Sequence, residues 1–381
     1  MSVEDVRQAV AMVAREFAVE RRERQQRTGL HREDFDALAA AGLQLTGLPE
    51  ERGGLWRSLP ESSRGICEIY RSLAHGDSSV ALVTSMHPAV LAFWLALREV
   101  PQPDTSAWRQ QRETIFDTVE RGAWWGTITS EPGSGGDVTR SKAVARREGD
   151  GWRLTGQKHF GSGSGMTSYM ITTALAEGEE KPDWFYLPVE GNTFDGSAGI
   201  SMVAPWDGHG MRATQSHALA FEACPAVRVA WPGHMLDLIG AAAPFISALF
   251  TAVVLGIVET AVETARAQLV PKARSLRSYE EVEWAQAELE AWTMEQAYQG
   301  MLRAIESGES ARRAAVQGKT MAAQLAESSM LRICRVLGGG TFARHSPFGH
   351  WFEDVRALGF LRPPWGLAYD RLIMDLLGAD E

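Results

Sequence analysis

A run of twenty residues without a charged side chain, residues 239–258, limits the folds open to this chain more than any other feature. Its length meets the criterion for a membrane-spanning helix. The run contains Pro244, Ser247, Thr251 and five alanines, and its helical pattern continues without a break into Glu259 with no Lys or Arg flank. A helix that is apolar on every side lies inside a large core. We therefore expect a buried central helix of a soluble bundle and no membrane span.

Helical and strand-like patterns divide the chain into three parts. Apolar side chains recur at largely helical spacing through residues 1–121, which form the first expected domain. Residues 122–233 hold more Gly, Thr and Ser, and helical patterns return over residues 234–381. Short runs with strand character lie in the middle part at 169–174, 184–189 and 218–221. The expected fold class is α+β, mostly α, in the order helices, sheet, helices.

Charge and cysteine content exclude several function classes. A net charge of -10 argues against a nucleic-acid surface, which needs clustered Lys and Arg. The three cysteines are far apart with no CxxC pair, and the histidines show no metal-ligand spacing, so we expect neither disulfides nor a metal site. The N-terminus carries Glu4 and Asp5 instead of a basic segment before an apolar run, so we expect no signal peptide. These features predict a cytoplasmic protein with a small-molecule substrate.

Two glycine-rich segments in the middle part point to a flavin. Residues 125–137 read Trp-Gly-Thr-Ile-Thr-Ser-Glu-Pro-Gly-Ser-Gly-Gly-Asp, and residues 156–163 read Gly-Gln-Lys-His-Phe-Gly-Ser-Gly. Thr129 and Ser130 can bond the polar edge of a redox ring, and the turn 133–136 can expose amide groups to a phosphate. By composition alone, such a segment is more often a surface turn.

These segments, together with a third near the C-terminus, resemble the acyl-CoA dehydrogenase superfamily. Its members carry a Thr-Glu-Pro-x-x-Gly-Ser-Asp turn, a Gly-x-Lys-x-aromatic-x-Ser/Thr-Gly strand, and a Gly-Gly pair with an Arg-Asp-x-Arg-like element. The matching residues are 130–137, 156–163, 336–339 and 353–356. The resemblance implies an N-terminal helical domain, a central β-barrel domain, a C-terminal four-helix bundle, and a homotetramer or homodimer in which two subunits contact each flavin. The implied flavin-binding residues are Thr129, Ser130, Gly135, Gly136, Phe160, Ser162, Arg274, Gly338 and Gly339.

Two flavin-binding positions depart from the family pattern. Gly136 stands where the family has a phosphate-binding Ser, so backbone amides must compensate and the flavin is expected to be lightly held. The family's Arg that meets the neighbouring subunit's flavin diphosphate falls in a divergent stretch. Lys272, Arg274 and Arg277 are all candidates for it.

The residue at the position of the catalytic base of acyl-CoA dehydrogenases also differs from the family pattern. An acyl-CoA dehydrogenase needs a carboxylate to remove the α proton of its substrate. The family alignment places Arg362 there, followed by Pro363 and Pro364, and a guanidinium that stays protonated cannot act as this base. The other position that the family uses lies in the long apolar helix, where residues 245–255 contain no acid. Both routes to dehydrogenation look closed.

The second segment instead resembles the flavin-dependent monooxygenase branch of the superfamily, that of dibenzothiophene monooxygenase and indole hydroxylases. There it commonly reads Lys-His-Phe-x-Ser-Gly, as residues 158–163 do. These enzymes take reduced FAD or FMN from a separate NAD(P)H flavin reductase and use O2 through a C4a-(hydro)peroxyflavin. The resemblance implies hydroxylation of a small hydrophobic or aromatic substrate, as in secondary metabolism. Phe160 would cover one ring face, and Ser162 would face the ring nitrogen that gains a proton on reduction.

Two further side chains are candidate catalytic groups beside Ser162. His87 matches a helix His next to the oxygen site of these monooxygenases and can donate a proton, although a capping or packing role fits equally well. Arg362 can steady a peroxide or bind an acidic substrate, and a structural salt bridge fits equally well. Two other functions stay open: a divergent acyl-CoA or acyl-carrier dehydrogenase whose base is Glu353 or Asp370, and a non-catalytic flavin-binding subunit.

Overall fold

The N-terminal part of the chain is helical, as expected. The computed structural model describes residues 1–97 and 105–377. Side-chain caps begin several helices: the Ser58 hydroxyl accepts from Glu61 N, and the Asp77 carboxylate from Val80 N at 2.9 Å. The elements are α1 (Val3–Val19), α2 (Arg21–Arg24), α3 (Arg32–Ala40), η1 (Leu43–Gly47), η2 (Glu50–Arg52), α4 (Leu59–Ala74), α5 (Ser78–Leu95) and α6 (Thr105–Glu120).

The middle part forms a closed barrel. The pairing order β4-β2-β3-β7-β5 returns to β4, so five strands close on themselves, while β1 adds in parallel to β4 and β6 adds to β7. Closure removes exposed sheet edges. The strands are β1 (Trp125–Thr127), β2 (Val144–Glu148), β3 (Gly151–Gly161), β4 (Tyr169–Ala176), β5 (Pro182–Pro188), β6 (Ile200–Ala204) and β7 (His217–Arg228), and η3 (Val138–Arg140) follows β1.

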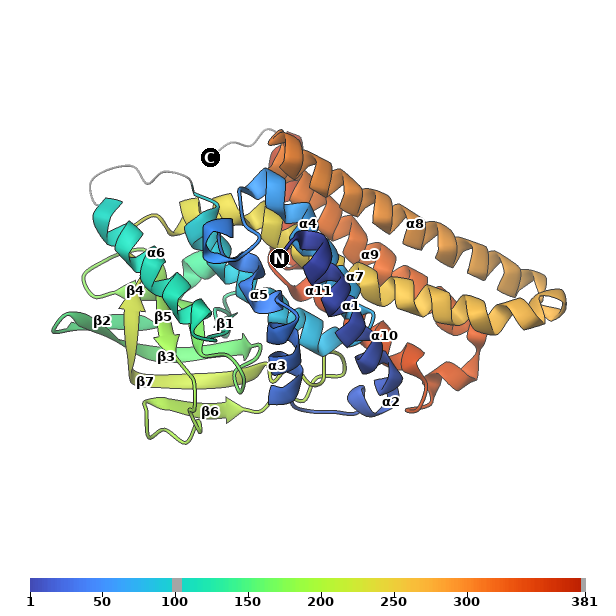
Figure 1. The fold of residues 1–381 in the computed structure, drawn as a ribbon, viewed down its shortest axis with the longest axis horizontal. Coiled ribbons are helices and arrows are strands. Elements are labelled where there is room, and N and C mark those ends of the chain that lie inside the picture. Colours follow the sequence, from blue (N-terminus) through green and yellow to red (C-terminus); the bar gives the residue numbers. More distant parts are fainter. Residues whose placement is uncertain (98–104, 378–381) are drawn as a thin grey trace.

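Long helices return after the barrel. They pack side by side and extend away from the barrel, with α4 of the N-terminal part packed against α7 and α8 (Figure 1). The long helices of this part are interrupted at Val270–Ser275, before Ala311 and after Leu337. The elements are α7 (Met235–Leu269), η4 (Val270–Ser275), α8 (Ser278–Ser307), α9 (Ala311–Leu337), η5 (Gly339–Phe342), α10 (Pro347–Val355), α11 (Ala357–Phe360) and α12 (Trp365–Leu377).

Helices α5 and α7 form the centre of the protein. Both are long and apolar enough to cross a membrane, but 94% and 83% of the residues in their apolar windows are buried inside the protein. Residues 247–258 of α7 are buried throughout. This is the environment of a core helix, and it explains the charge-free run in the sequence.

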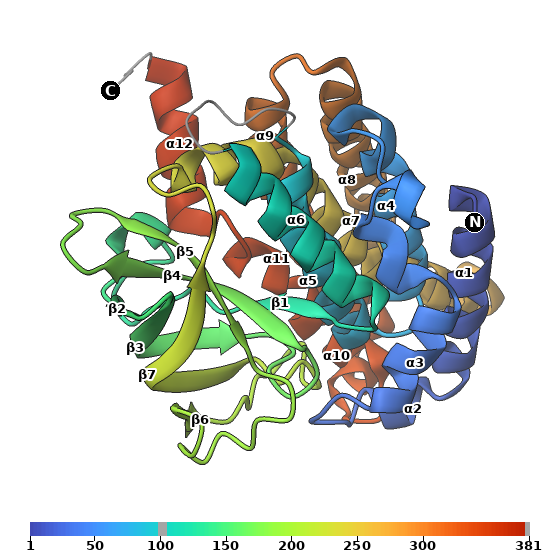
Figure 2. The same cartoon turned by 60° about the vertical axis from the view of Figure 1, so that its left-hand side comes forward.

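Two hydrophobic cores place the site between them. The larger core joins the helical parts, and a smaller one fills the barrel around Ile128, Leu154 and Phe185. Figure 2 shows the barrel strands on one side and the helices on the other, with β1 and α5 at the junction. The predicted fold class, with its central β-barrel between helical parts, is confirmed. The exact domain limits at 121 and 233 stay a prediction.

Candidate active site

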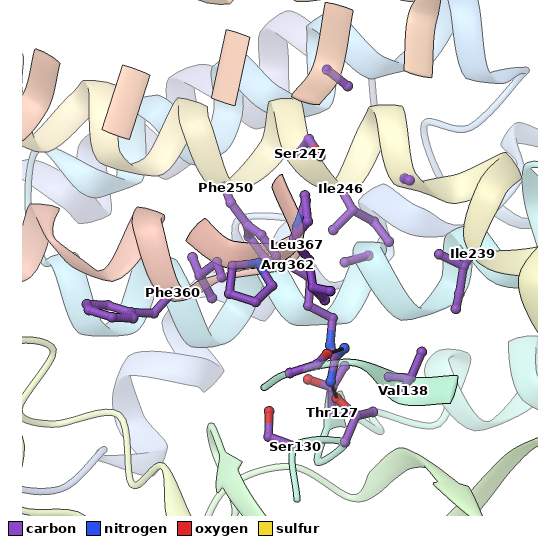
Figure 3. A pocket seen from close by; sticks show the side chains of 18 of the residues that line it. Thr127, Ser130, Val138, Ile239, Ile246, Ser247, Phe250, Phe360, Arg362 and Leu367 are labelled. Carbon is purple, nitrogen blue, oxygen red and sulfur yellow. Dashed lines mark hydrogen bonds between the residues drawn. The ribbon is translucent and has the colours of Figure 1, made fainter. Parts of the chain in front are cut away.

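A cavity of about 1640 Å³ lies between the barrel and the helices. One side is formed by residues 129–137, which we call the glycine turn, together with the end of β3; we call this side the strand wall. The other side is formed by α5, α7, the start of α9 and residues 353–371; we call it the helical wall (Figure 3). Single-ligand pockets usually measure about 300–1000 Å³. The cavity therefore has room for a flavin and a small second molecule.

The glycine turn has a backbone that only glycine adopts readily. Gly133, Gly135 and Gly136 have φ of 76°, 63° and 83°, in the left-handed region. The Gly136 amide donates to Ser134 Oγ at 3.2 Å, whereas in the part of the chain that the structure describes the Gly133 and Gly135 amides donate no hydrogen bond. Thr129, Ser130, Gly135 and Gly136 all line the cavity, as predicted from the motif. The turn can offer two amide donors to an anion.

A buried ion pair supports the glycine turn from below. Lys158 Nζ lies 2.5 Å from Glu131 Oε1 and also donates to the carbonyl of Thr173 at 2.5 Å. Glu131 in turn accepts from the amides of Lys142 and Ala143 at 2.6 and 3.1 Å. Burial alone would raise the pKa of Glu131, but the hydrogen bonds from Lys158, Ser141 and the Lys142 amide, together with the charge of Lys158, outweigh it and hold that pKa below its usual value. The sequence motifs contained both residues, but their pairing becomes visible only in the closed barrel.

A chain of hydroxyl groups orients Ser162. Thr214 Oγ1 donates to the carbonyl of Met211 at 2.8 Å, so Ser216, at 2.7 Å, must donate to Thr214. Ser162 lies 2.9 Å from Ser216 and must then donate to it. Ser162 is left with free acceptor capacity facing the cavity, which suits an N–H group of a ligand. Sequence reasoning found Ser162 but missed Ser216, because the two residues meet only through the pairing of β3 with β7.

Phe160 lines the cavity beside Ser162. Its φ is 58°, and its side chain is 59% exposed, so the ring faces open space with one edge against Trp206. A left-handed backbone at a bulky residue is strained and marks functional sites. The ring is placed to cover one face of a flat ligand.

Arg362 reaches across the cavity from the helical wall to the strand wall (Figure 3). It lies between α11 and α12, and its guanidinium donates to Thr129 Oγ1 at 2.6 Å and to the carbonyl of Gly136. Burial lowers the pKa of Arg362 to about 10, so the group is charged at neutral pH. The side chain aligned with the dehydrogenase base is therefore a cation that touches the glycine turn.

The predicted catalytic role of His87 is not supported. Its ring is fully buried and does not line the cavity. Nδ1 accepts from the amide of Trp125 at 2.9 Å, and Nε2 donates to the carbonyl of Gln44 at 2.9 Å. Burial lowers the pKa of His87 to about 4, so the ring is neutral with both nitrogens occupied. His87 ties β1 to η1 and has no proton to give to a ligand.

Three of the predicted flavin-binding residues lie away from the cavity. Arg274 is exposed in η4, Gly338 follows α9, and Gly339 begins η5; none of them lines the cavity. Within one chain they cannot meet a flavin held at the glycine turn. Their assignment stays a prediction that depends on a second subunit.

The third motif is also mainly structural. Asp354 accepts from the amide of Met211 at 2.6 Å, and burial raises its pKa to about 6. Glu353 lines the cavity, but its carboxylate is 2.6 Å from Arg356. Asp370 does not line the cavity. Of the two alternative bases considered from the sequence, only Glu353 faces the cavity.

The comparisons with known proteins agree with this geometry. Residues 126–224 match the family model of the acyl-CoA dehydrogenase middle domain. FMN-bound TdsC from Paenibacillus sp. A11-2 superimposes with a TM-score of 0.80 at 20% identity, covering 98% of each chain. The chain has the acyl-CoA dehydrogenase fold. The resemblance inferred from the three motifs is confirmed.

Several curated relatives of this chain have names that describe monooxygenases, and two others are named nitrososynthases. The probable FMNH2-dependent monooxygenase SfnC of Pseudomonas putida is 29% identical over 69% of this chain and 61% of the relative. A dibenzothiophene monooxygenase of Mycolicibacterium goodii is 26% identical over 66% of this chain and 59% of the relative. The chain thus matches about 60% of the length of each relative.

Proposed function

We propose that the protein is a flavin-dependent monooxygenase. The observation that carries the proposal is Arg362: the side chain that reaches the glycine turn from the helical wall is a cation, where dehydrogenation needs a carboxylate base. The named relatives SfnC and dibenzothiophene monooxygenase support the same branch.

The cofactor that we propose is reduced FMN, with FAD as the alternative. The strand wall fits a flavin in three respects: two free amides at Gly133 and Gly135, the exposed ring of Phe160, and the acceptor oxygen of Ser162. Bound reduced flavin would supply the electrons that activate O2. We propose that the activated oxygen would be held as a peroxide on the flavin ring. The Ser162 oxygen would hold the proton on the ring nitrogen, and a water-poor cavity would protect the adduct.

The substrate that we propose is small and hydrophobic or aromatic. The helical wall offers an apolar surface that faces the glycine turn (Figure 3). Apolar pockets with a few placed polar groups bind such molecules. The lining side chains include Leu236, Ile239, Ile246, Phe250, Phe360 and Leu367.

The remaining parts of the proposal concern the setting of the enzyme. An enzyme that uses reduced flavin needs a reductase, so we propose a separate NAD(P)H flavin reductase as partner, in the cytoplasm. A homotetramer or homodimer would bring Arg274, Gly338 and Gly339 of one subunit toward the flavin of another.

An anaerobic titration tests the proposal against acyl-CoA dehydrogenation. Protein loaded with oxidised flavin is mixed with a panel of acyl-CoA thioesters, and the flavin absorbance is followed. We expect no bleaching, because Arg362, a cation, stands at the position aligned with the dehydrogenase base. Bleaching that is lost in Glu353→Gln would overturn the proposal and identify a dehydrogenase, since Glu353 faces the cavity. If the protein binds flavin in neither redox state, the proposal fails and a non-catalytic role remains.

A further inference from the structure

Arg362 has a positive charge without a carboxylate partner. Its two hydrogen bonds go to neutral oxygens, and it forms no ion pair with any residue of 1–97 or 105–377. The charge of Asp137 favours the protonated form of Arg362, but the two groups form no ion pair, and Oδ1 of Asp137 accepts from the amide and hydroxyl of Thr139 at 2.9 and 2.7 Å. A half-buried cation without a carboxylate in contact is costly. An anion that entered the cavity at the glycine turn would remove this cost.

The position of Arg362 is linked to the missing side chain at Gly136. A Cβ built on Gly136 would lie 2.8 Å from Cγ of Pro364, in a proline ring that cannot rotate away. A Ser at this position would therefore collide with the segment 362–364. The chain has a guanidinium beside Gly136 where the family pattern has a hydroxyl.

Lys319 fixes the same segment from behind. Lys319 is a residue of α9 and is only 2% exposed, and its ammonium group donates to the carbonyl of Pro363 at 2.9 Å. Arg371, which lines the cavity, adds positive charge near Arg362. Lys319 is a positioning residue for the segment that carries Arg362.

We propose that Arg362 binds the flavin phosphate within one subunit, in place of the Ser that Gly136 has replaced. The inference rests on the proposed function, because it requires a flavin. A guanidinium can donate two parallel hydrogen bonds to a phosphate. The free amides of Gly133 and Gly135 supply further donors on the same turn. The rival ligand is an anionic substrate, which shares the chemistry but not the dependence on the flavin phosphate.

A comparison of FMN with riboflavin, which lacks the phosphate, tests the proposal. Affinities of the full-length protein, Arg362→Gln and the control Arg371→Gln are measured by equilibrium dialysis. Arg371 suits as a control because it lines the same cavity but is not bonded to the glycine turn. We expect Arg362→Gln to weaken FMN binding about 10- to 100-fold, the range for a lost charge-assisted hydrogen bond. Riboflavin affinity should stay unchanged, which also shows that the variant is folded.

The other outcomes overturn the proposal in distinguishable ways. Equal losses for FMN and riboflavin would place Arg362 on the flavin ring or in a structural role. If neither flavin loses affinity in Arg362→Gln, Arg362 does not bind the flavin phosphate, and an anionic substrate becomes its expected ligand. If wild-type protein binds neither flavin, the proposed function fails together with this inference. Arg362→Lys should keep part of the preference for FMN, because a charge remains without the planar fork.

Discussion

The two walls of the cavity each rest on a buried lysine, and the two lysines are held in opposite ways. Lys158, under the strand wall, pairs with Glu131 and donates to the carbonyl of Thr173 as well. Lys319, under the helical wall, donates to the carbonyl of Pro363 at 2.9 Å and forms no ion pair with any described residue. Burial lowers the pKa of Lys158 to about 8, against the pull of Glu131, and that of Lys319 to about 7 with nothing opposing it.

The difference shows how one fold can keep a cofactor site and change its chemistry. The lysine under the strand wall is paired internally, so Lys158 and Glu131 serve as a scaffold for the glycine turn, whose free amides stay available to a ligand. The helical wall contributes Arg362, a guanidinium with no ion pair among residues 1–97 and 105–377, so it is the side with a charge left for a ligand. A change of reaction then needs only a change in the helical wall.

The largest expected effect comes from replacing the two lysines by Met. Lys158→Met leaves the Glu131 carboxylate buried without its cation and should lower the free energy of unfolding by about 3–5 kcal/mol. Lys319→Met removes a group that has no counter-ion among the described residues, but it leaves the Pro363 carbonyl without its donor, so the loss should be about 1–2 kcal/mol. Denaturant unfolding of both variants measures the contrast. Equal losses would show that the walls do not differ in this way.

The next effect concerns His87, which ties the strand wall to η1. His87→Gln disrupts two buried hydrogen bonds to the backbone and should cost about 2–3 kcal/mol at neutral pH. Burial lowers the pKa of His87 in the folded protein to about 4, from the usual histidine value of 6.5. The unfolded chain therefore binds the extra proton, and wild-type stability falls as the pH drops from 6.5 toward 4, by an amount on the order of 3 kcal/mol.

The pH dependence separates a structural His87 from a catalytic one. Unfolding curves of wild type, His87→Gln and the surface control His31→Gln are compared between pH 7 and pH 4. The loss of stability should be smaller in His87→Gln alone. If the three proteins lose stability in parallel, His87 is not a buried neutral histidine.

Alanine in the glycine turn gives a smaller effect, with a matched control. Both Gly133 and Gly136 have positive φ, so each substitution should cost about 1–2 kcal/mol of backbone strain. Only at Gly136 does the added Cβ meet Pro364; at Gly133 there is nothing within 4 Å. Gly136→Ala should therefore weaken flavin binding more than Gly133→Ala in fluorescence titrations. Equal flavin affinities would separate the segment 362–364 from the flavin site.

The smallest effect is expected at Ser162. Ser162→Ala removes the acceptor for the ring proton and should shorten the life of the flavin–oxygen adduct about 3- to 10-fold. Ser216→Ala keeps the Ser162 oxygen but removes the partner that orients it, so its effect should be weaker. Stopped-flow absorbance measures both. An unchanged decay in Ser162→Ala would remove Ser162 from the mechanism.

The sequence predicted the fold and most of the strand wall, because its motifs are local. The positive-φ glycines, Phe160 and Ser162 occur in two short segments, and the motif in each segment was enough to predict that these residues line a flavin site. The missed features join distant residues: Glu131 and Lys158 are 27 positions apart, and Ser162 and Ser216 are 54 apart. For His87 the sequence left a catalytic and a packing role open, because a motif match cannot show that both ring nitrogens bind the backbone. Arg274, Gly338 and Gly339 stay predictions, since one chain cannot show what a second subunit contributes.

The reoxidation of reduced FMN by O2 tests most directly whether the strand wall holds a flavin for oxygen chemistry. Reduced FMN with an excess of the protein is mixed with oxygenated buffer, and the return of oxidised flavin is followed by stopped-flow absorbance. We predict two phases, in which oxidised flavin returns only after a transient species decays. A single phase at the rate of free FMN, under conditions where equilibrium dialysis shows that reduced FMN is bound, would contradict the proposed oxygenase function.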